Sequence, residues 1–189
     1  MPGPMEIIRE LGRRVDRFFA AARRRNPGAL RCGPGCGDCC HRSLELLPIE
    51  VRRLVAAARR LPGEDRARIL RAARRARRDP QAPCPLLRDG RCQTYVSRPV
   101  VCRCHGLPLR VTVGHKHELS LCPYNFPGLS CAGESCVLDL APVNQLLKEA
   151  NHRACAHAGE DPAPVPLAAA LIAGLRGRSR PRADRRRRP

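Results

Sequence analysis

Four cysteines lie close together in residues 32–40 of this chain. They are Cys32, Cys36, Cys39 and Cys40, in the run CGPGCGDCC, with glycine and proline between them. Thiolate sulfur is the ligand that zinc and iron–sulfur clusters prefer, and loops of small residues allow several sulfurs to converge on one centre. Because Cys39 and Cys40 are adjacent, they point differently in most backbone geometries, so one can serve a different metal from the other. The pattern favours metal binding over a disulfide knot.

A second cysteine-bearing region begins at Cys84 in the run CPLLRDGRCQTYVSRPVVCRCHG. Its Asp89-Gly90 pair predicts a tight turn, which brings Cys84 and Cys92 together. Cys102 follows the Arg98-Pro99 pair, and Cys122 follows a predicted β-hairpin. Neither cysteine region alone supplies a well-spaced, closed ligand set. We therefore expect the two regions to contribute ligands to one site or to adjacent sites.

The two motifs together resemble the YkgJ-like family of bacterial cysteine-cluster proteins, described as zinc- or iron-chelating or as similar to iron–sulfur oxidoreductases. The resemblance covers roughly residues 30–125. It rests on CxxxCxxCC followed by CPLL-x4-C-x2-Y-x3-RP-x2-CR, together with Pro48, Glu50 and Cys122-Pro123. It implies a metal centre and leaves the chemistry of that centre open. Flagellin lysine N-methylases carry a related cluster, but this chain has no recognisable S-adenosylmethionine loop, and whether it is an enzyme stays undecided.

The predicted metal ligands are the eight cysteines of these motifs. The set is Cys32, Cys36, Cys39, Cys40, Cys84, Cys92, Cys102 and Cys122. Arg98 and Arg103 are expected to bind the cofactor by offsetting thiolate charge through N–H···S contacts. All-thiolate ligands suit zinc and iron–sulfur clusters, including [4Fe–4S], so ligand type does not choose between them.

The other cysteines and the histidines lie outside the motifs or depart from them. Free or buried thiols are favoured over ligation at Cys104, Cys131, Cys136 and Cys155. His41 and His105 are weaker candidate ligands, and His115 and His117 are expected to be exposed on the hairpin.

Composition indicates where the protein acts and which partners it meets. The N-terminus lacks the apolar block of a signal peptide, and no apolar stretch is long enough to span a bilayer. We therefore expect a cytoplasmic protein, in a compartment where thiols stay reduced. The net charge of +19 resembles that of nucleic-acid-binding proteins, but much of it lies in the Arg-rich tail, and only 3% of the residues are aromatic. Nucleic-acid binding through this tail is therefore not favoured.

The pattern of apolar residues predicts a mainly α, cysteine-rich, metal-stabilised domain with a short β-hairpin. An amphipathic helix is expected within residues 1–28, the metal-binding domain over 29–158, and a disordered tail over 159–189. Further helices are predicted from about Leu47 to Leu61, from Glu64 to Arg78 and from Ala141 to His152, with the hairpin centred on Gly114.

Two functions follow from these features. The first is a zinc or iron–sulfur protein with a redox or accessory role, working with a redox partner protein. The second is a zinc-stabilised module that binds nucleic acid or an acidic partner through its basic surface, an affinity that would fall steeply with salt.

Overall fold

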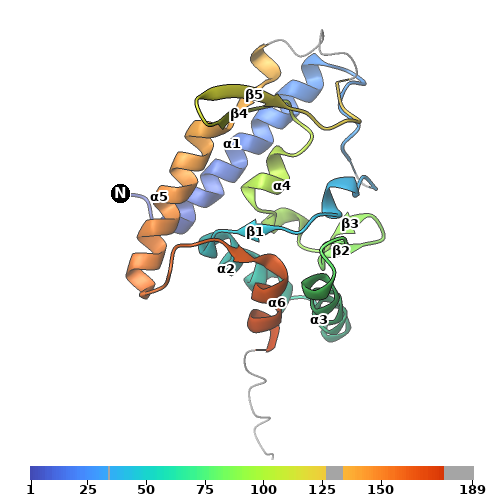
Figure 1. Ribbon diagram of the computed structural model, residues 1–189, viewed down its shortest axis with the longest axis vertical. Helices are drawn as coiled ribbons and strands as arrows, with labels where there is room; N and C mark the ends of the chain where they lie inside the picture. The colour runs from blue at the N-terminus through green and yellow to red at the C-terminus, as the bar shows by residue number, and fades with distance from the viewer. Residues whose placement is uncertain (34, 127–133, 177–189) are drawn as a thin grey trace, which may run out of the picture.

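The computed structural model describes residues 1–33, 35–126 and 134–176. Over these residues the protein is mainly helical with a few short strands, which confirms the expected fold class. Two long helices, α1 (Pro4–Arg25) and α5 (Leu140–Ala158), lie side by side (Figure 1). Apolar residues three and four positions apart give each helix one buried stripe, and the stripes meet around Ile8, Leu11 and Leu147.

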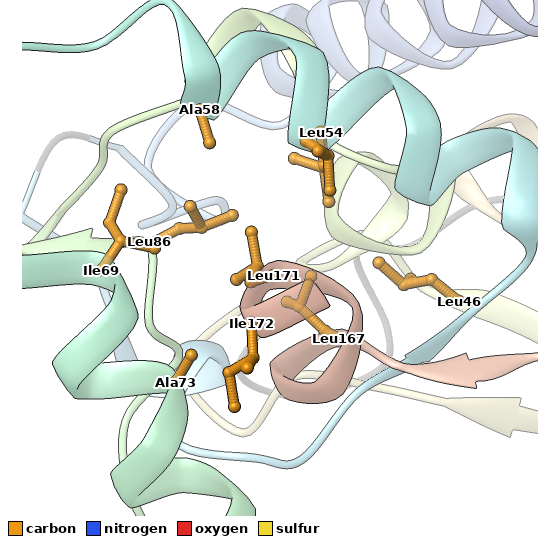
Figure 2. Close-up of a cluster of buried hydrophobic side chains, with 10 residues drawn as sticks. Leu46, Leu54, Ala58, Ile69, Ala73, Leu86, Leu167, Leu171 and Ile172 are labelled. Carbon is orange, nitrogen blue, oxygen red and sulfur yellow. The ribbon is translucent and has the colours of Figure 1, made fainter. Parts of the chain in front are cut away.

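A second group of helices forms the other end of the molecule (Figure 1). It consists of α2 (Pro48–Arg59), α3 (Gly63–Arg78) and α6 (Leu167–Arg176). Pro48 occupies the first turn of α2, where its missing N–H leaves no hydrogen bond unmade. Figure 2 shows Leu171 of α6 among side chains from the neighbouring elements, including Leu54 and Leu86.

Helix α6 differs from the expectation that a disordered tail begins at residue 159. Residues 165–176 belong to the folded domain, and Leu167, Leu171 and Ile172 are buried in its core. Before the helix, β7 (Val165–Pro166) pairs antiparallel with β1 (Glu45–Leu46). The Pro- and Ala-rich composition concealed an apolar stripe at helical spacing, which α2 and α3 cover. The Arg-rich end of the predicted tail, from residue 177, lies outside the described residues.

Short strands carry the chain between the helices. The predicted hairpin is formed by β4 (Leu109–Val113) and β5 (Lys116–Ser120), and β6 (Leu138–Asp139) adds a parallel pairing to β4. The predicted turn at Asp89-Gly90 joins β2 (Leu87–Arg88) to β3 (Arg91–Cys92), with both turn residues at positive φ. Four short helical segments complete the described fold, and two of them, η1 and α4, contain motif cysteines. They are η1 (Asp38–Cys40), η2 (Tyr95–Ser97), α4 (Val100–Cys104) and η4 (Glu134–Cys136).

The predicted helix boundaries agree with the structure to within a few residues, except that α5 continues to Ala158. In the described part of the chain, no helix has the length and apolar composition needed to cross a membrane.

Candidate metal centre

The two cysteine regions meet at one cavity, here called the first cavity. Its volume is about 410 Å³, and six of the predicted ligands line it: Cys36, Cys39, Cys40, Cys84, Cys92 and Cys102. Tyr95, Arg98 and His105 also reach this cavity, and Leu54, Leu86 and Leu167 contribute to its apolar wall. The structure therefore places at one cavity cysteines that are separated by more than forty residues in the sequence.

Backbone contacts hold the two cysteine loops against each other. The N–H of Cys84 donates to the carbonyl oxygen of Cys40 at 2.7 Å. Gly90, at φ +70°, approaches Gly35 so closely that a Cβ on Gly90 would lie 3.1 Å from the Cα of Gly35. Glycine is needed at residue 90 for both reasons, because other side chains are strained at positive φ and would crowd the facing loop.

Cys102 is carried by the short helix α4, whose N-terminus is held by Glu50. The carboxylate of Glu50 is buried, and its Oε1 accepts a hydrogen bond of 2.7 Å from the backbone N–H of Val100. A carboxylate at a helix N-terminus satisfies a free N–H and interacts favourably with the helix dipole. Glu50 therefore positions the helix that presents Cys102, although it does not line the first cavity among the described residues.

Replacing Glu50 by alanine is expected to lower the free energy of unfolding by about 2–3 kcal/mol, because it removes a buried, charge-assisted hydrogen bond. Glu50→Gln is the matched control, since it keeps an oxygen acceptor for Val100 and should cost less.

Burial raises the pKa of Glu50. Ionised Glu50 is therefore less favourable in the folded protein than in the unfolded chain. The free energy of unfolding should fall as the pH rises from the unfolded-state pKa through the folded-state pKa of Glu50, and Glu50→Gln should remove this pH dependence. Urea unfolding at several pH values measures both effects. Equal stability of the alanine and glutamine variants would contradict this role.

Arg98 places a positive charge at the first cavity. Its guanidinium stacks on the ring of Tyr95, with Cζ 3.6 Å from the ring centroid, and Nη1 donates to the carbonyl oxygen of Cys102 at 3.4 Å. Its Nε is buried and has no hydrogen-bond partner among the described residues. A buried N–H donor without a partner, beside several thiols, suits a group that gains thiolate charge when metal binds.

Arg103 is committed elsewhere. Its three guanidinium nitrogens bond to the carboxylate of Asp16 on α1, to the carbonyl oxygen of Val96 at 2.6 Å and to that of Arg98 at 2.9 Å. These contacts join α4 to α1 and fix the loop that carries Arg98. They favour a positioning role for Arg103, so its predicted contact with the cofactor stays a prediction.

Burial favours the protonated form of two thiols at the first cavity, Cys84 and Cys102. It raises the pKa of Cys84 to about 11 and that of Cys102 to about 12, and neighbouring thiolates add to both shifts. Hydrogen bonds from the backbone N–H groups of Leu86 and Leu87 oppose the rise at Cys84. The pKa of Cys39 is also raised, first by its hydrogen bond with Cys40 and then by burial. Metal ions bind thiolates, so binding here must release protons.

The remaining two predicted ligands, Cys32 and Cys122, line a second cavity of about 320 Å³. Cys36, Cys39 and His105 border this second cavity as well as the first. Asn125, only 3% exposed, donates from Nδ2 to the sulfur of Cys32 at 3.1 Å. Asn125 was missed from the sequence; its position three residues after Cys122, in CPYNF, is the only signal there.

The other cysteines of the described chain are packed in the protein interior. Cys104, Cys136 and Cys155 are buried, as expected for thiols outside the motifs, while Cys131 lies outside the described residues. Cys136 accepts a hydrogen bond from Asn26, and Arg52 contacts Cys155.

The candidate histidines differ in exposure and in whether they line a cavity. His41 is exposed and lines neither cavity among the residues described, and His115 and His117 are exposed on the hairpin. His105 is half-buried, and burial and the nearby Arg42 lower its pKa.

Soft sulfur donors, the buried Nε of Arg98 without a hydrogen-bond partner among the described residues, and two glycine-lined loops fit a thiolate-bound metal. Across residues 1–33, 35–126 and 134–176, no three His, Cys, Asp or Glu side chains already have the spacing of a closed site around one ion. The structure therefore gathers the sulfurs along the cavity walls, and their convergence on a metal is part of the proposal below.

Cysteine loops that meet in this way within a small helical domain are the arrangement expected of thiolate-rich metal-binding proteins. Residues 31–120 match the CxxCxxCC family, whose description is "Putative zinc- or iron-chelating domain". The match confirms the resemblance to a family of metal-chelating cysteine-cluster proteins and leaves the identity of the metal open. No curated protein and no solved structure gives a significant match to the chain.

Proposed function

We propose that this protein binds an iron–sulfur cluster in the first cavity and serves in electron transfer. The observation that carries the proposal is the cavity itself, which is lined by six cysteines and has a volume of about 410 Å³. Four sulfurs at ~2.3 Å close the coordination sphere of a single zinc ion, which is fewer than the six that line this cavity. A cluster is larger, and its four cysteine ligands stand further apart.

Cys40, Cys84, Cys92 and Cys102 are the proposed ligands, because they line the first cavity and not the second. The bound cluster would supply a one-electron redox centre. Arg98 would offset the added negative charge, and the backbone N–H groups of Leu86 and Leu87 lower the pKa of Cys84 against the rise that burial causes. Positive charge and N–H···S bonds favour the reduced state and raise the reduction potential. Leu54, Leu86 and Leu167 would restrict the access of water.

A partner protein would reach the cluster at the rim of the cavity. Tyr95 and Val101 line the cavity yet are 58% and 41% exposed, and the adjacent Val96 is 81% exposed. Exposed apolar residues grouped at a cofactor are typical of surfaces that bind another protein. A thiolate-bound cluster fits the expected cytoplasmic location, where thiols stay reduced and available to bind metal.

Purification of the full chain without oxygen tests the cluster. We expect a brown protein that contains iron and acid-labile sulfide in equal amounts, with a visible absorption that bleaches on addition of dithionite. A colourless protein that contains zinc and no iron would overturn the electron-transfer role and leave a zinc-stabilised module.

A further inference from the structure

The eight predicted ligands do not all face the same space. Cys40, Cys84, Cys92 and Cys102 line the first cavity alone, and Cys32 and Cys122 line the second cavity alone. Only Cys36 and Cys39 border both. One centre that used all eight sulfurs would have to extend across the wall that separates the two cavities.

Cys39 lies at this wall, and the adjacent Cys40 lines the first cavity alone. Both belong to η1, a 3₁₀ helix, in which consecutive side chains point about 120° apart. The backbone of Cys40 is fixed to the second cysteine region by its hydrogen bond from Cys84. Cys39 lines the second cavity together with Cys32, Cys36 and Cys122, and it also borders the first cavity.

Resting on the proposed metal-binding function, we propose that these cysteines form two separate four-sulfur sites. The first is the cluster site described above. The second consists of Cys32, Cys36, Cys39 and Cys122 and takes a divalent zinc-type ion. A set of four thiolates closes the coordination sphere of zinc, which makes the second site structural.

The surroundings of Cys32 are built to hold a thiolate. Asn125 is fixed on both sides, because its Oδ1 accepts from the N–H of Arg31 at 2.9 Å and its Nδ2 donates to the carbonyl oxygen of Gly106 at 2.8 Å. The same Nδ2 donates to the sulfur of Cys32. Gly106 has φ +97°, and a Cβ there would overlap the Cys32 sulfur. A fixed N–H donor on a ligand sulfur is the kind of contact that tunes a metal site.

The second site would fasten the first cysteine motif to the far end of the hairpin. Cys122 follows β5, whereas Cys32 and Cys36 follow α1. A zinc ion between them would link the α1–α5 part of the fold to the loop that supplies Cys40 to the first cavity. Its binding energy would thereby become folding energy.

Paired cysteine variants of the full chain separate the two sites. The variants are Cys32→Ser with Cys122→Ser, and Cys84→Ser with Cys92→Ser. Zinc, iron and acid-labile sulfide are counted per chain after anaerobic purification. We expect the first variant to lose about one equivalent of zinc and keep its iron and sulfide, and the second to lose iron and sulfide and keep its zinc. Cys136→Ser, a buried thiol outside both sets, is the matched control and should keep both metals.

Retention of all metal by the Cys32/Cys122 variant would overturn the second site. So would loss of all metal from either variant while its circular dichroism stays that of the wild type. If a paired variant fails to fold, Asn125→Ala tests the second site instead, because it keeps every sulfur. We expect this variant to bind less zinc and the same amount of iron. An unchanged zinc content would contradict the proposal.

The two proposals fail in distinguishable ways. Wild-type protein with two zinc ions and no sulfide overturns the cluster, and each paired variant should then lose one zinc. Iron and sulfide without zinc overturn only the second site. Wild-type protein without metal overturns both.

Discussion

The affinity of the full chain for zinc is expected to fall about a hundredfold for each unit by which the pH is lowered near neutrality. This figure counts only the protons that Cys84 and Cys102 release. Both thiols have a raised pKa, about 11 and about 12, so each is protonated at pH 7 and must lose a proton to bind. Each such thiol makes affinity fall about tenfold per pH unit. Zinc is a suitable probe because thiolate sites bind it whichever metal they hold in the cell. Competition with a chelator of known pH dependence measures the slope.

The helix α4 supplies a matched pair of variants for this measurement. Cys102 lines the first cavity, whereas Cys104 is buried in the α1–α5 core; burial raises the pKa of both to about 12. Cys102→Ala should reduce the number of protons released on binding by about one, while Cys104→Ala should leave it unchanged. If both variants release as many protons as the wild type, Cys102 is not a ligand.

Leu171→Ala is expected to lower the free energy of unfolding by about 3 kcal/mol, measured by urea titration. Leu171 of α6 is completely buried in the hydrophobic cluster that Figure 2 shows, where α6 packs against the neighbouring elements. The exposed Ala173 on the same helix is the control, and Ala173→Ser should change stability by less than about 0.5 kcal/mol. Because Leu167 of the same helix lines the first cavity, loss of the α6 packing should also reduce metal retention. An unchanged unfolding midpoint for Leu171→Ala would show that α6 does not belong to the cooperative fold.

The sequence by itself predicted helices α1, α2, α3 and α5 and the family resemblance. Helix α1 has its apolar residues at helical spacing, and Asn26-Pro27-Gly28 follows its C-terminus, so both its face and its end are local properties. The same holds for the turn at Asp89-Gly90, where short-range sterics select the residues. Cysteine spacing likewise carried enough information to name the family that residues 31–120 match.

Only the tertiary structure decided which residues surround the sulfurs and where the domain ends. Asn125 reaches Cys32, and Glu50 reaches Val100, across long stretches of chain, so no local pattern marks either contact. Arg98 and Arg103 are alike in the motif, yet one faces the first cavity and the other bonds to Asp16 on α1. Helix α6 has an Ala-rich composition that is stable only against α2 and α3, because short helices gain most of their stability from packing. Local spacing fixes which side chains an element presents, whereas burial and hydrogen bonding between distant segments fix what those side chains meet.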